Sequence, residues 1–170
     1  WCHPVLFQRL AAARAMRGTR VVVVDPRRTA SCDIADLHLA LAPGADAALF
    51  NLLLAEIHAR SFDYAENIDG IEAALAAAHA TDPAQAGLTA AELAQFFDLW
   101  LGSDKVVTVY SQGINQSDSG TDKVNAILNC HLATGRIGRP GMGPFSVTGQ
   151  PNAMGGREVG GLANMLACHL

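Results

Sequence analysis

Two short polar segments follow apolar runs typical of buried strands, and both carry residue types that bind nucleotides. The first is Asp25-Pro26-Arg27-Arg28-Thr29, directly after four consecutive valines. A carboxylate at the end of a parallel strand accepts hydrogen bonds from ribose or guanine, and arginines pair with phosphate. A solvated turn explains the same residues, so spacing alone leaves both interpretations open.

The second segment, 111–122, follows a run typical of a strand at 105–110 and precedes a helix from about Lys123. A helix N-terminus below a Gly- and Ser-rich loop suits an anion such as pyrophosphate, although an ordinary capped helix explains the pattern equally well. G-x-G-x-x-G is missing after the first strand, and G-x-x-x-x-G-K-[ST] is missing throughout. Ordinary NAD and P-loop sites are therefore disfavoured.

The third segment, 135–161, is rich in Gly and Pro and has no sustained hydrophobic period, so we expect it to be irregular. Of the 16 glycines, 11 lie between Gly113 and Gly161. Arg136, Arg139 and Arg157 precede any acidic residue of the segment. Arginines among closely placed glycines indicate guanidinium and backbone groups approaching an anionic ligand. The alternative is a surface loop with solvated arginines.

Other chemistries have little support. The four cysteines form no C-x-x-C or other close pair, which argues against zinc or iron–sulfur sites within the chain. H-x-x-x-H, H-E-x-x-H and G-x-S-x-G do not occur, so hydrolase chemistry has no specific signal. Four histidines are expected to be structural or exposed and not ligands: His38, His58, His79 and His131.

The elements that must position these segments follow the order helix, strand, strand, helices, strand, helix. The sequence predicts helices at 4–17, 47–60, 72–80, 89–101, 123–134 and 160–169, and strands at 21–24, 37–41 and 105–110. Asp46 is placed to cap the second helix, and Thr89 with Glu92 forms a capping box. Four consecutive valines indicate a strand buried on both faces. This order implies an α/β fold with a largely parallel sheet.

The composition suits one domain with a core: 170 residues, 50% hydrophobic and 16% charged, with a mean hydropathy of +0.19. A net charge of −4 gives no field for nucleic acid, and no apolar run approaches the roughly 18–20 residues of a membrane span. The opening Trp1 and the abrupt apolar end lead us to expect an internal piece of a larger protein, so a missing signal peptide carries no information.

Long stretches resemble a known family. WCHPVLFQR, VVVVDPRRTASCDIADLHLALAPGAD and YSQGINQSDSGTDKVNAILNCHLATGRIGRPGMGPFSVTGQPNAMGGREVGG are similar to molybdopterin oxidoreductases of the dimethyl sulfoxide reductase family. The run GPFSVTGQPNAMGGREVGG resembles the catalytic subunits of bacterial assimilatory nitrate reductases more than formate dehydrogenases. The resemblance implies a Rossmann-like domain at 1–134 that binds molybdopterin guanine dinucleotide, and a Gly- and Arg-rich active-site segment at 135–170 that leads into a further domain.

The resemblance also implies residue roles. The cofactor-binding positions would be Trp1, Cys2, Asp25, Pro26, Arg27, Arg28, Thr29, Gly44, Ala45, Asp46, Gln112 and Gln116. Arg157 would guide an anionic substrate near molybdenum, with Gln150 beside it. The residue that ligates molybdenum would lie upstream of Trp1, so no metal ligand is expected within the chain. The 4Fe–4S cluster of the parent enzyme would also be held outside it.

The activity implied is reduction of nitrate to nitrite by a larger cytoplasmic enzyme that contains molybdenum bis(molybdopterin guanine dinucleotide). Its partners would be nitrate, a redox donor and the remaining domains, with no nucleic acid and no membrane span, and the isolated piece would be inactive. The alternatives are a formate dehydrogenase-like member of the family and a non-catalytic nucleotide-binding module.

Overall fold

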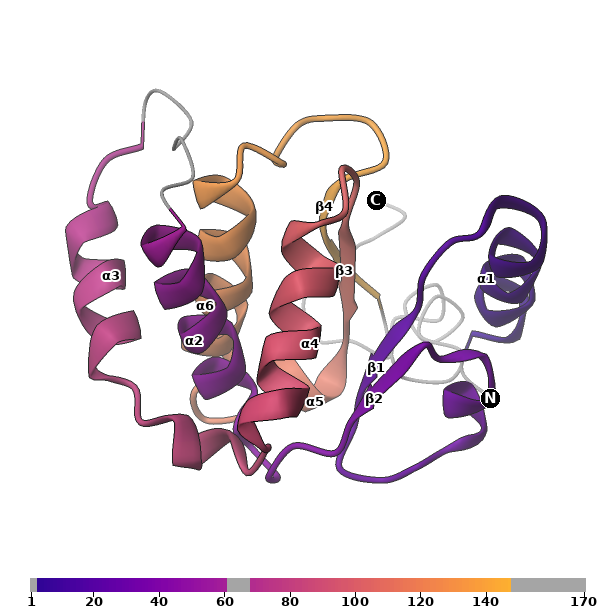
Figure 1. Cartoon of the computed structure of the whole chain (residues 1–170), viewed down its shortest axis with the longest axis horizontal. Helices are drawn as coiled ribbons and strands as arrows, with labels where there is room; N and C mark the ends of the chain where they lie inside the picture. Colours follow the sequence, from indigo (N-terminus) through magenta and orange to yellow (C-terminus); the bar gives the residue numbers. More distant parts are fainter. Residues whose placement is uncertain (1–2, 61–67, 148–170) are drawn as a thin grey trace, which may run out of the picture.

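Residues 3–60 and 68–147 are described by a computed structural model of the chain. Within these ranges the fold is α/β, with two short parallel strand pairs and helices packed beside them (Figure 1). The predicted fold class is therefore confirmed, and the short parallel strands are compatible with a Rossmann-like description. The helix predicted at 160–169 lies outside the described residues.

Each strand pair is parallel and short. β1 (Val22–Val24) pairs with β2 (Leu37–Leu39), with Val22 opposite Leu37. β3 (Val107–Tyr110) pairs with β4 (Gly143–Ser146), with Val109 opposite Phe145. β4 was not predicted because Gly and Pro are unfavourable strand residues, so this part of the segment expected to be irregular is a strand.

β1 differs from expectation in its burial. Val21 is buried, but all three residues of β1 are only half-buried, and so the prediction of a strand buried on both faces is wrong for the strand itself. The physical reason lies in the pairing: among the described residues β1 has one hydrogen-bonded neighbour, β2, and does not lie at the centre of a larger sheet.

The helices agree closely with the sequence. Their bounds are α1 Pro4–Arg17, α2 Asp46–Ala59, α3 Ile71–Ala80, α4 Ala90–Leu101, α5 Gln112–Asn115 and α6 Gly120–Ala133, with 3₁₀ turns η1 at Ala30–Ile34 and η2 at Pro83–Ala86. Gly18 ends α1 in the left-handed conformation, and the capping box of Thr89 and Glu92 is present. The predicted cap at Asp46 is wrong, because Ala45 is the N-cap residue and Asp46 is the first residue of α2.

The core lies among α2, α4 and α6. Leu49, Leu53, Leu54 and Ile57 of α2 and Ile127 of α6 have no exposed surface. Phe96 and Trp100 of α4 join the same cluster, as do Leu37 and Leu39 of β2. Burial of large aliphatic side chains is the main favourable contribution to folding. Because α2 supplies most of the large aliphatic side chains without exposed surface among the described residues, it lies at the centre of the core.

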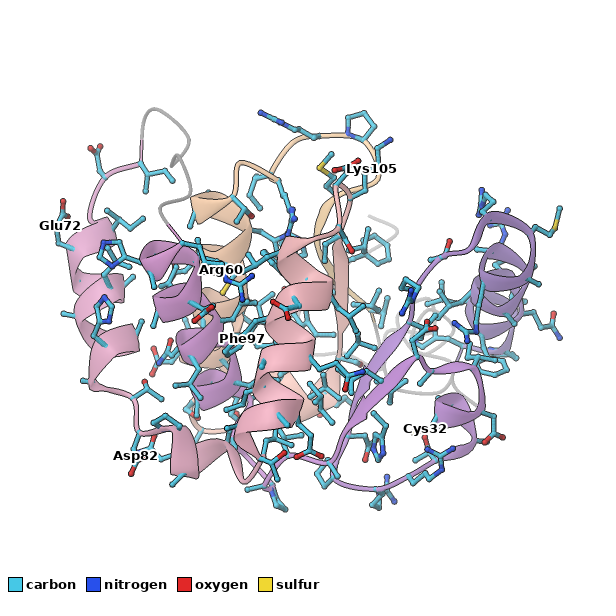
Figure 2. All side chains as sticks on the ribbon, in the orientation of Figure 1. Cys32, Arg60, Glu72, Asp82, Phe97 and Lys105 are labelled. Carbon is cyan, nitrogen blue, oxygen red and sulfur yellow. The ribbon has the colours of Figure 1, made fainter. Side chains whose placement is uncertain are left out.

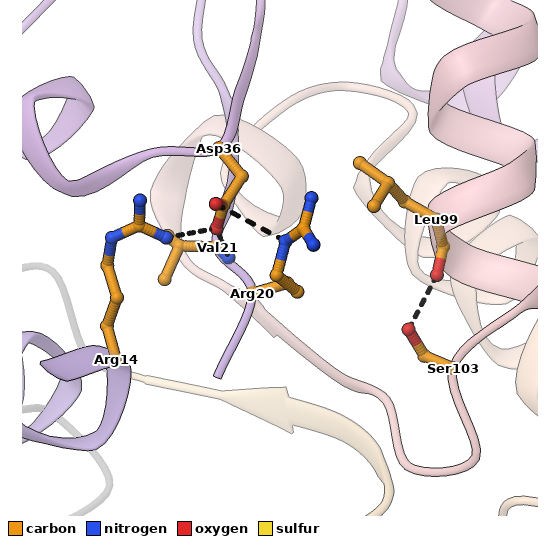
Figure 3. Close-up of polar contacts among 6 residues, drawn as sticks. All are labelled: Arg14, Arg20, Val21, Asp36, Leu99 and Ser103. Carbon is orange, nitrogen blue, oxygen red and sulfur yellow. Dashed lines mark hydrogen bonds and ion pairs between the residues drawn. The ribbon is translucent and has the colours of Figure 1, made fainter. Parts of the chain in front are cut away.

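α1 is attached differently. It has no buried residue, and Leu6 remains 40% exposed. Asp36, just before β2, contacts the guanidinium groups of both Arg14 and Arg20 and accepts a hydrogen bond of 2.7 Å from the backbone N–H of Val21 (Figure 3). The Arg14 contact is the main cause that holds the pKa of Asp36 below its ordinary value. A charged junction therefore fixes α1 to the start of β1.

One apolar surface is open to solvent. Val107 and Val109 are two residues apart in β3 and so share one face, and Phe145 lies opposite Val109 in β4. Their exposed fractions are 49%, 49% and 55%. Across residues 3–60 and 68–147, no helix has the length and apolar character needed to cross a membrane.

Candidate functional site

A cleft of about 270 Å³ lies where the carboxyl ends of β1 and β3 approach the start of α2. Its lining residues are Val24, Asp25, Asp46, Phe50, Thr108, Val109, Tyr110, Ser111, Gly113, Ile114 and Ile127. The apolar part of the lining includes Phe50, Ile114 and Ile127, and the two carboxylates come from the end of β1 and from the first residue of α2. The structure thus brings two of the predicted cofactor-binding residues, Asp25 and Asp46, to the same cleft as Ser111 and Gly113 of the predicted segment 111–122. Ligands of open parallel sheets bind at such strand ends.

Asp25 is held at the rim by its own backbone and by the turn that follows. Its N–H donates to the carbonyl of Leu39 at 3.2 Å, and its carbonyl is 2.9 Å from Nε2 of His38. Its Oδ1 accepts the backbone N–H of Arg27 at 2.8 Å. Oδ1 of Asp25 thus stabilises the turn after β1, and the residue also borders the cleft.

Asp46 is held by a buried cation. Nζ of Lys123 lies 3.4 Å from Oδ2 of Asp46, and the side chains of Lys123 and Asp46 are 7% and 19% exposed. Lys123 projects from α6, so the pair joins the start of α2 to α6 at the edge of the cleft. A buried lysine requires a charge partner, and Asp46 supplies it. This pairing was not predicted, because the two residues are far apart along the chain.

The segment after β3 is not the simple loop that we expected. Residues 112–115 form the short helix α5, and α6 begins at Gly120. A Cβ at Gly120 would lie 2.6 Å from the carbonyl oxygen of Asn115, so only glycine fits where α5 and α6 meet. Ser111 borders the cleft, and its buried Oγ has no hydrogen-bond partner among residues 3–60 and 68–147.

A buried histidine contacts one of the residues that line the cleft. Thr108 borders the cleft, and its Oγ1 is 2.8 Å from Nε2 of His131. His131 is fully buried, and burial, with a smaller contribution from Arg136, lowers its pKa to about 4. The ring is therefore neutral at physiological pH, which confirms the structural role expected for His131.

Arg136 does not face a ligand. Its guanidinium lies 4.1 Å from the centre of the Trp100 ring and donates hydrogen bonds to the carbonyls of Trp100 and Ser103 at 3.2 and 2.6 Å. Only 6% of the residue is exposed. The prediction that Arg136 approaches an anionic ligand is therefore wrong: the arginine is used to bind the carbonyls at the end of α4.

The remaining predicted residues divide into two sets. Those described but not lining the cleft are Pro26, Arg27, Arg28, Thr29, Gly44, Ala45, Gln112 and Gln116, which adjoin the lining residues in sequence. Those outside the described residues are Trp1, Cys2, Gln150 and Arg157. In the part of the chain that the structure describes, no group of three or more His, Cys, Asp or Glu could hold a metal ion.

Two of the four cysteines lie in the described residues. Cys32 and Cys130 are both buried free thiols. Burial raises the pKa of the Cys130 thiol, and its Sγ donates to the carbonyl of Phe50 at 3.1 Å. Cys130 is therefore a packing residue of α6 and not a nucleophile or metal ligand.

Comparison with protein families gives a match over residues 1–168 to the model described as "Molybdopterin oxidoreductase". The match includes both strand pairs and the cleft. It agrees with the resemblance noted from the sequence.

Three curated relatives define the similarity. A nitrate reductase of Klebsiella oxytoca is 55% identical over all of this chain, which corresponds to 20% of that protein. A nitrate reductase of Shewanella frigidimarina is 49% identical over all of the chain and 19% of the relative. An F420-dependent formate dehydrogenase subunit alpha of Methanocaldococcus jannaschii is 28% identical over 96% of the chain and 25% of the relative. The chain thus spans about a fifth to a quarter of the length of these relatives.

Proposed function

The chain belongs to the molybdopterin oxidoreductase family, and from this premise we propose that it is part of a nitrate reductase that converts nitrate to nitrite. The observation that carries the proposal is the identity of 55% to a nitrate reductase along the whole chain, against 28% to a formate dehydrogenase subunit. Because the chain spans about a fifth of such proteins, the activity would belong to the complete protein.

We further propose that the cofactor is molybdenum bis(molybdopterin guanine dinucleotide) and that the cleft holds part of it. The residues present fit a guanosine group: two carboxylates accept hydrogen bonds, and the buried Ser111 hydroxyl, which has no partner in the described part of the chain, can bind a polar atom. The volume of about 270 Å³ is slightly below the range of roughly 300–1,000 Å³ for small-molecule pockets, so other parts of the protein would contact the rest. When bound, the group supplies the molybdenum centre at which oxygen leaves nitrate.

Within this proposal the residues of the chain bind and orient the cofactor. Asp25 and Asp46 would accept hydrogen bonds from N–H and O–H groups of guanine or ribose, and Lys123 would hold Asp46 in place. The side chain of Arg27 is 84% exposed, its Nε lies 3.9 Å from Oδ1 of Asp25, and its guanidinium would pair with phosphate. Pro26, Arg28, Thr29, Gly44 and Ala45 would shape the two turns, and Trp1, Cys2, Gln112 and Gln116 would complete the contacts.

Substrate contacts are proposed for the C-terminal segment. Arg157 would attract nitrate by its charge, and Gln150 would lie close by; neither would act as a general base. We also propose the division into a cofactor-binding domain at 1–134 and an active-site segment at 135–170. The proposal also includes a redox donor, an iron–sulfur cluster outside this chain and a cytoplasmic location. Cell fractionation tests the location directly.

The test uses the complete protein purified with its cofactor. We expect stoichiometric molybdenum and a guanine nucleotide released on denaturation, with reduction of nitrate and no oxidation of formate. Formate oxidation without nitrate reduction would support the alternative enzyme, and absence of molybdenum would support a non-catalytic module.

Two variants assign the residues. Asp25→Asn with Asp46→Asn should lower the retained guanine nucleotide several-fold, because both acceptor carboxylates are lost, whereas the exposed Asp33→Asn serves as a matched control and should retain it. Arg157→Ala should raise KM for nitrate or lower kcat while molybdenum content stays near normal. Unchanged kinetics would contradict the role of Arg157.

A further inference from the structure

We propose that His58 and His79 form a two-histidine surface site for a late first-row transition-metal dication, Cu²⁺ above all. The site lies on the helical side of the molecule, away from the residues that line the cleft, and is independent of the proposed function. His58 is in the last turn of α2 and His79 is in the last turn of α3. Nδ1 of His58 and Nε2 of His79 are 2.9 Å apart.

The packing of α2 and α3 makes this pair. The two helices lie side by side in opposite directions (Figure 1). Helical side chains lean toward the N-terminus of their own helix, so in an antiparallel pair the two imidazoles lean toward each other. A second contact, from Nδ2 of Asn51 in α2 to Oγ1 of Thr81 at the end of α3, at 3.3 Å, joins the same two helices. The backbone positions of the two rings are therefore held in advance of any ligand.

The separation of the two nitrogens suits a metal ion. Metal–imidazole bonds are about 2.0 Å long, so neighbouring ligands of a square-planar ion lie about 2.8 Å apart and those of a tetrahedral ion about 3.3 Å apart. The observed 2.9 Å is close to the square-planar value. Square-planar nitrogen coordination is typical of Cu²⁺ and Ni²⁺, and the general order of affinity favours Cu²⁺.

Metal binding requires only that the proton of each neutral ring lie on the nitrogen that does not bind the metal. In the neutral pair one nitrogen donates its proton to the other, whereas metal binding needs both lone pairs. Each neutral ring meets that need by carrying its proton on its other nitrogen, so the change is a tautomer shift and a small ring rotation, with no net proton released. Both nitrogens of an imidazole are established metal ligands.

Among residues 3–60 and 68–147, the surroundings of the pair are open to solvent. Both histidines are exposed, and the residues one helical turn before them include Ala55 and Ala76, whose side chains are small. Arg60, the C-cap residue of α2, reaches toward α4 and is paired with Glu56 at 2.7 Å and with Asp98 at 2.8 Å (Figure 2). Its charge is therefore largely offset where a dication would bind.

The test titrates the complete protein with Cu²⁺–iminodiacetate, which leaves two coordination positions open for imidazoles. Electron paramagnetic resonance should show one bound copper per chain with coupling to two imidazole nitrogens. His58→Ala and His79→Ala should each weaken binding at least tenfold, and the affinity should fall on acidification because protonated imidazole cannot bind the metal. His79→Gln checks the result in a variant that keeps a polar side chain at the interface.

The matched control is His3→Ala, which removes an imidazole elsewhere and should leave copper binding unchanged. Molybdenum content and nitrate reduction should be the same in all of these variants, so the outcome is independent of the test of function. Equal copper affinity in the wild type and in His79→Gln would overturn the proposal, as would a signal with one coupled nitrogen in the wild type.

Discussion

Two regions of the molecule are held together by different forces. The N-terminal segment, residues 3–41, attaches α1 through the charged junction at Asp36, and α1 has no buried residue. The helical layer, formed by α2, α4 and α6, is held by side chains without exposed surface, such as Leu53 and Ile127. Apolar burial is insensitive to pH, whereas a charged junction depends on ionisation and on salt.

This difference bears on the cleft, because residues of both regions line it together with residues of β3 and α5. Asp25 belongs to the N-terminal segment, and Asp46 is the first residue of the helical layer. A ligand that contacts both carboxylates would therefore connect the N-terminal segment to the helical layer. Ligand binding of this kind stabilises the folded state by mass action, and the largest gain is expected in the N-terminal segment.

Removal of a core side chain should have the largest effect. Leu53→Ala creates a cavity at a site with no exposed surface and should lower the free energy of unfolding by about 3 kcal/mol. Leu6→Ala in α1 is the matched control: the same atoms are removed from a residue that is 40% exposed, and the loss should be below about 1 kcal/mol. Urea denaturation measures both. Equal losses would contradict the contrast between the two regions.

The next largest effect is expected at the pair that borders the cleft. Lys123→Met removes the cation that faces Asp46 and leaves that carboxylate poorly compensated, which should cost about 2 kcal/mol. Adding Asp46→Asn should recover part of this loss, because the uncompensated charge is then gone. A double-mutant cycle in urea measures the coupling, and additive losses would show that the pair contributes nothing.

A smaller loss is expected at the charged junction. Asp36→Asn should cost about 1 kcal/mol, because the partners are partly exposed and screened by solvent. The pKa of Asp36 is lowered in the folded state, so its contribution is complete at neutral pH and is lost as the pH falls through that lowered pKa, below the ordinary value of 3.8. The difference between wild type and variant should vanish in acid. A difference that persists there would assign the effect to packing.

The smallest effect should come from the cap of α4. Thr89→Ala removes the hydroxyl that accepts the N–H of Glu92 at 3.2 Å, and caps of this type contribute about 0.5–1 kcal/mol. Phe96 and Trp100 keep the helix in the core without it. Thermal unfolding followed by circular dichroism should show a shift of a few degrees at most, and a larger shift would mean that α4 depends on its polar end.

The sequence was sufficient where local rules decide the structure. Gly18 ends α1, and Thr89 with Glu92 begins α4, because the residues that make these contacts are neighbours in the chain. It failed where distant residues decide. Arg136 binds carbonyls of α4, and His58 meets His79 across 21 positions. β4 was missed because its strand conformation comes from pairing with β3 and not from the propensities of Gly143 and Pro144.

The site shows the same division. The rule for parallel strands placed Asp25 at a strand end, and the structure puts it on the cleft together with Asp46. The burial of Lys123 beside Asp46 could not be predicted, because it depends on how α6 packs against the start of α2. Whether these residues bind a cofactor stays a prediction for the experiments described above.

The open apolar face of β3 and β4 has a consequence for handling the chain in solution. Val107, Val109 and Phe145 are each about half exposed on neighbouring strands, and contiguous apolar surface of this kind promotes self-association. Sulfate and phosphate strengthen such contacts. We therefore expect light scattering to show larger particles as ammonium sulfate is added, and Phe145→Ser to move that onset to higher salt.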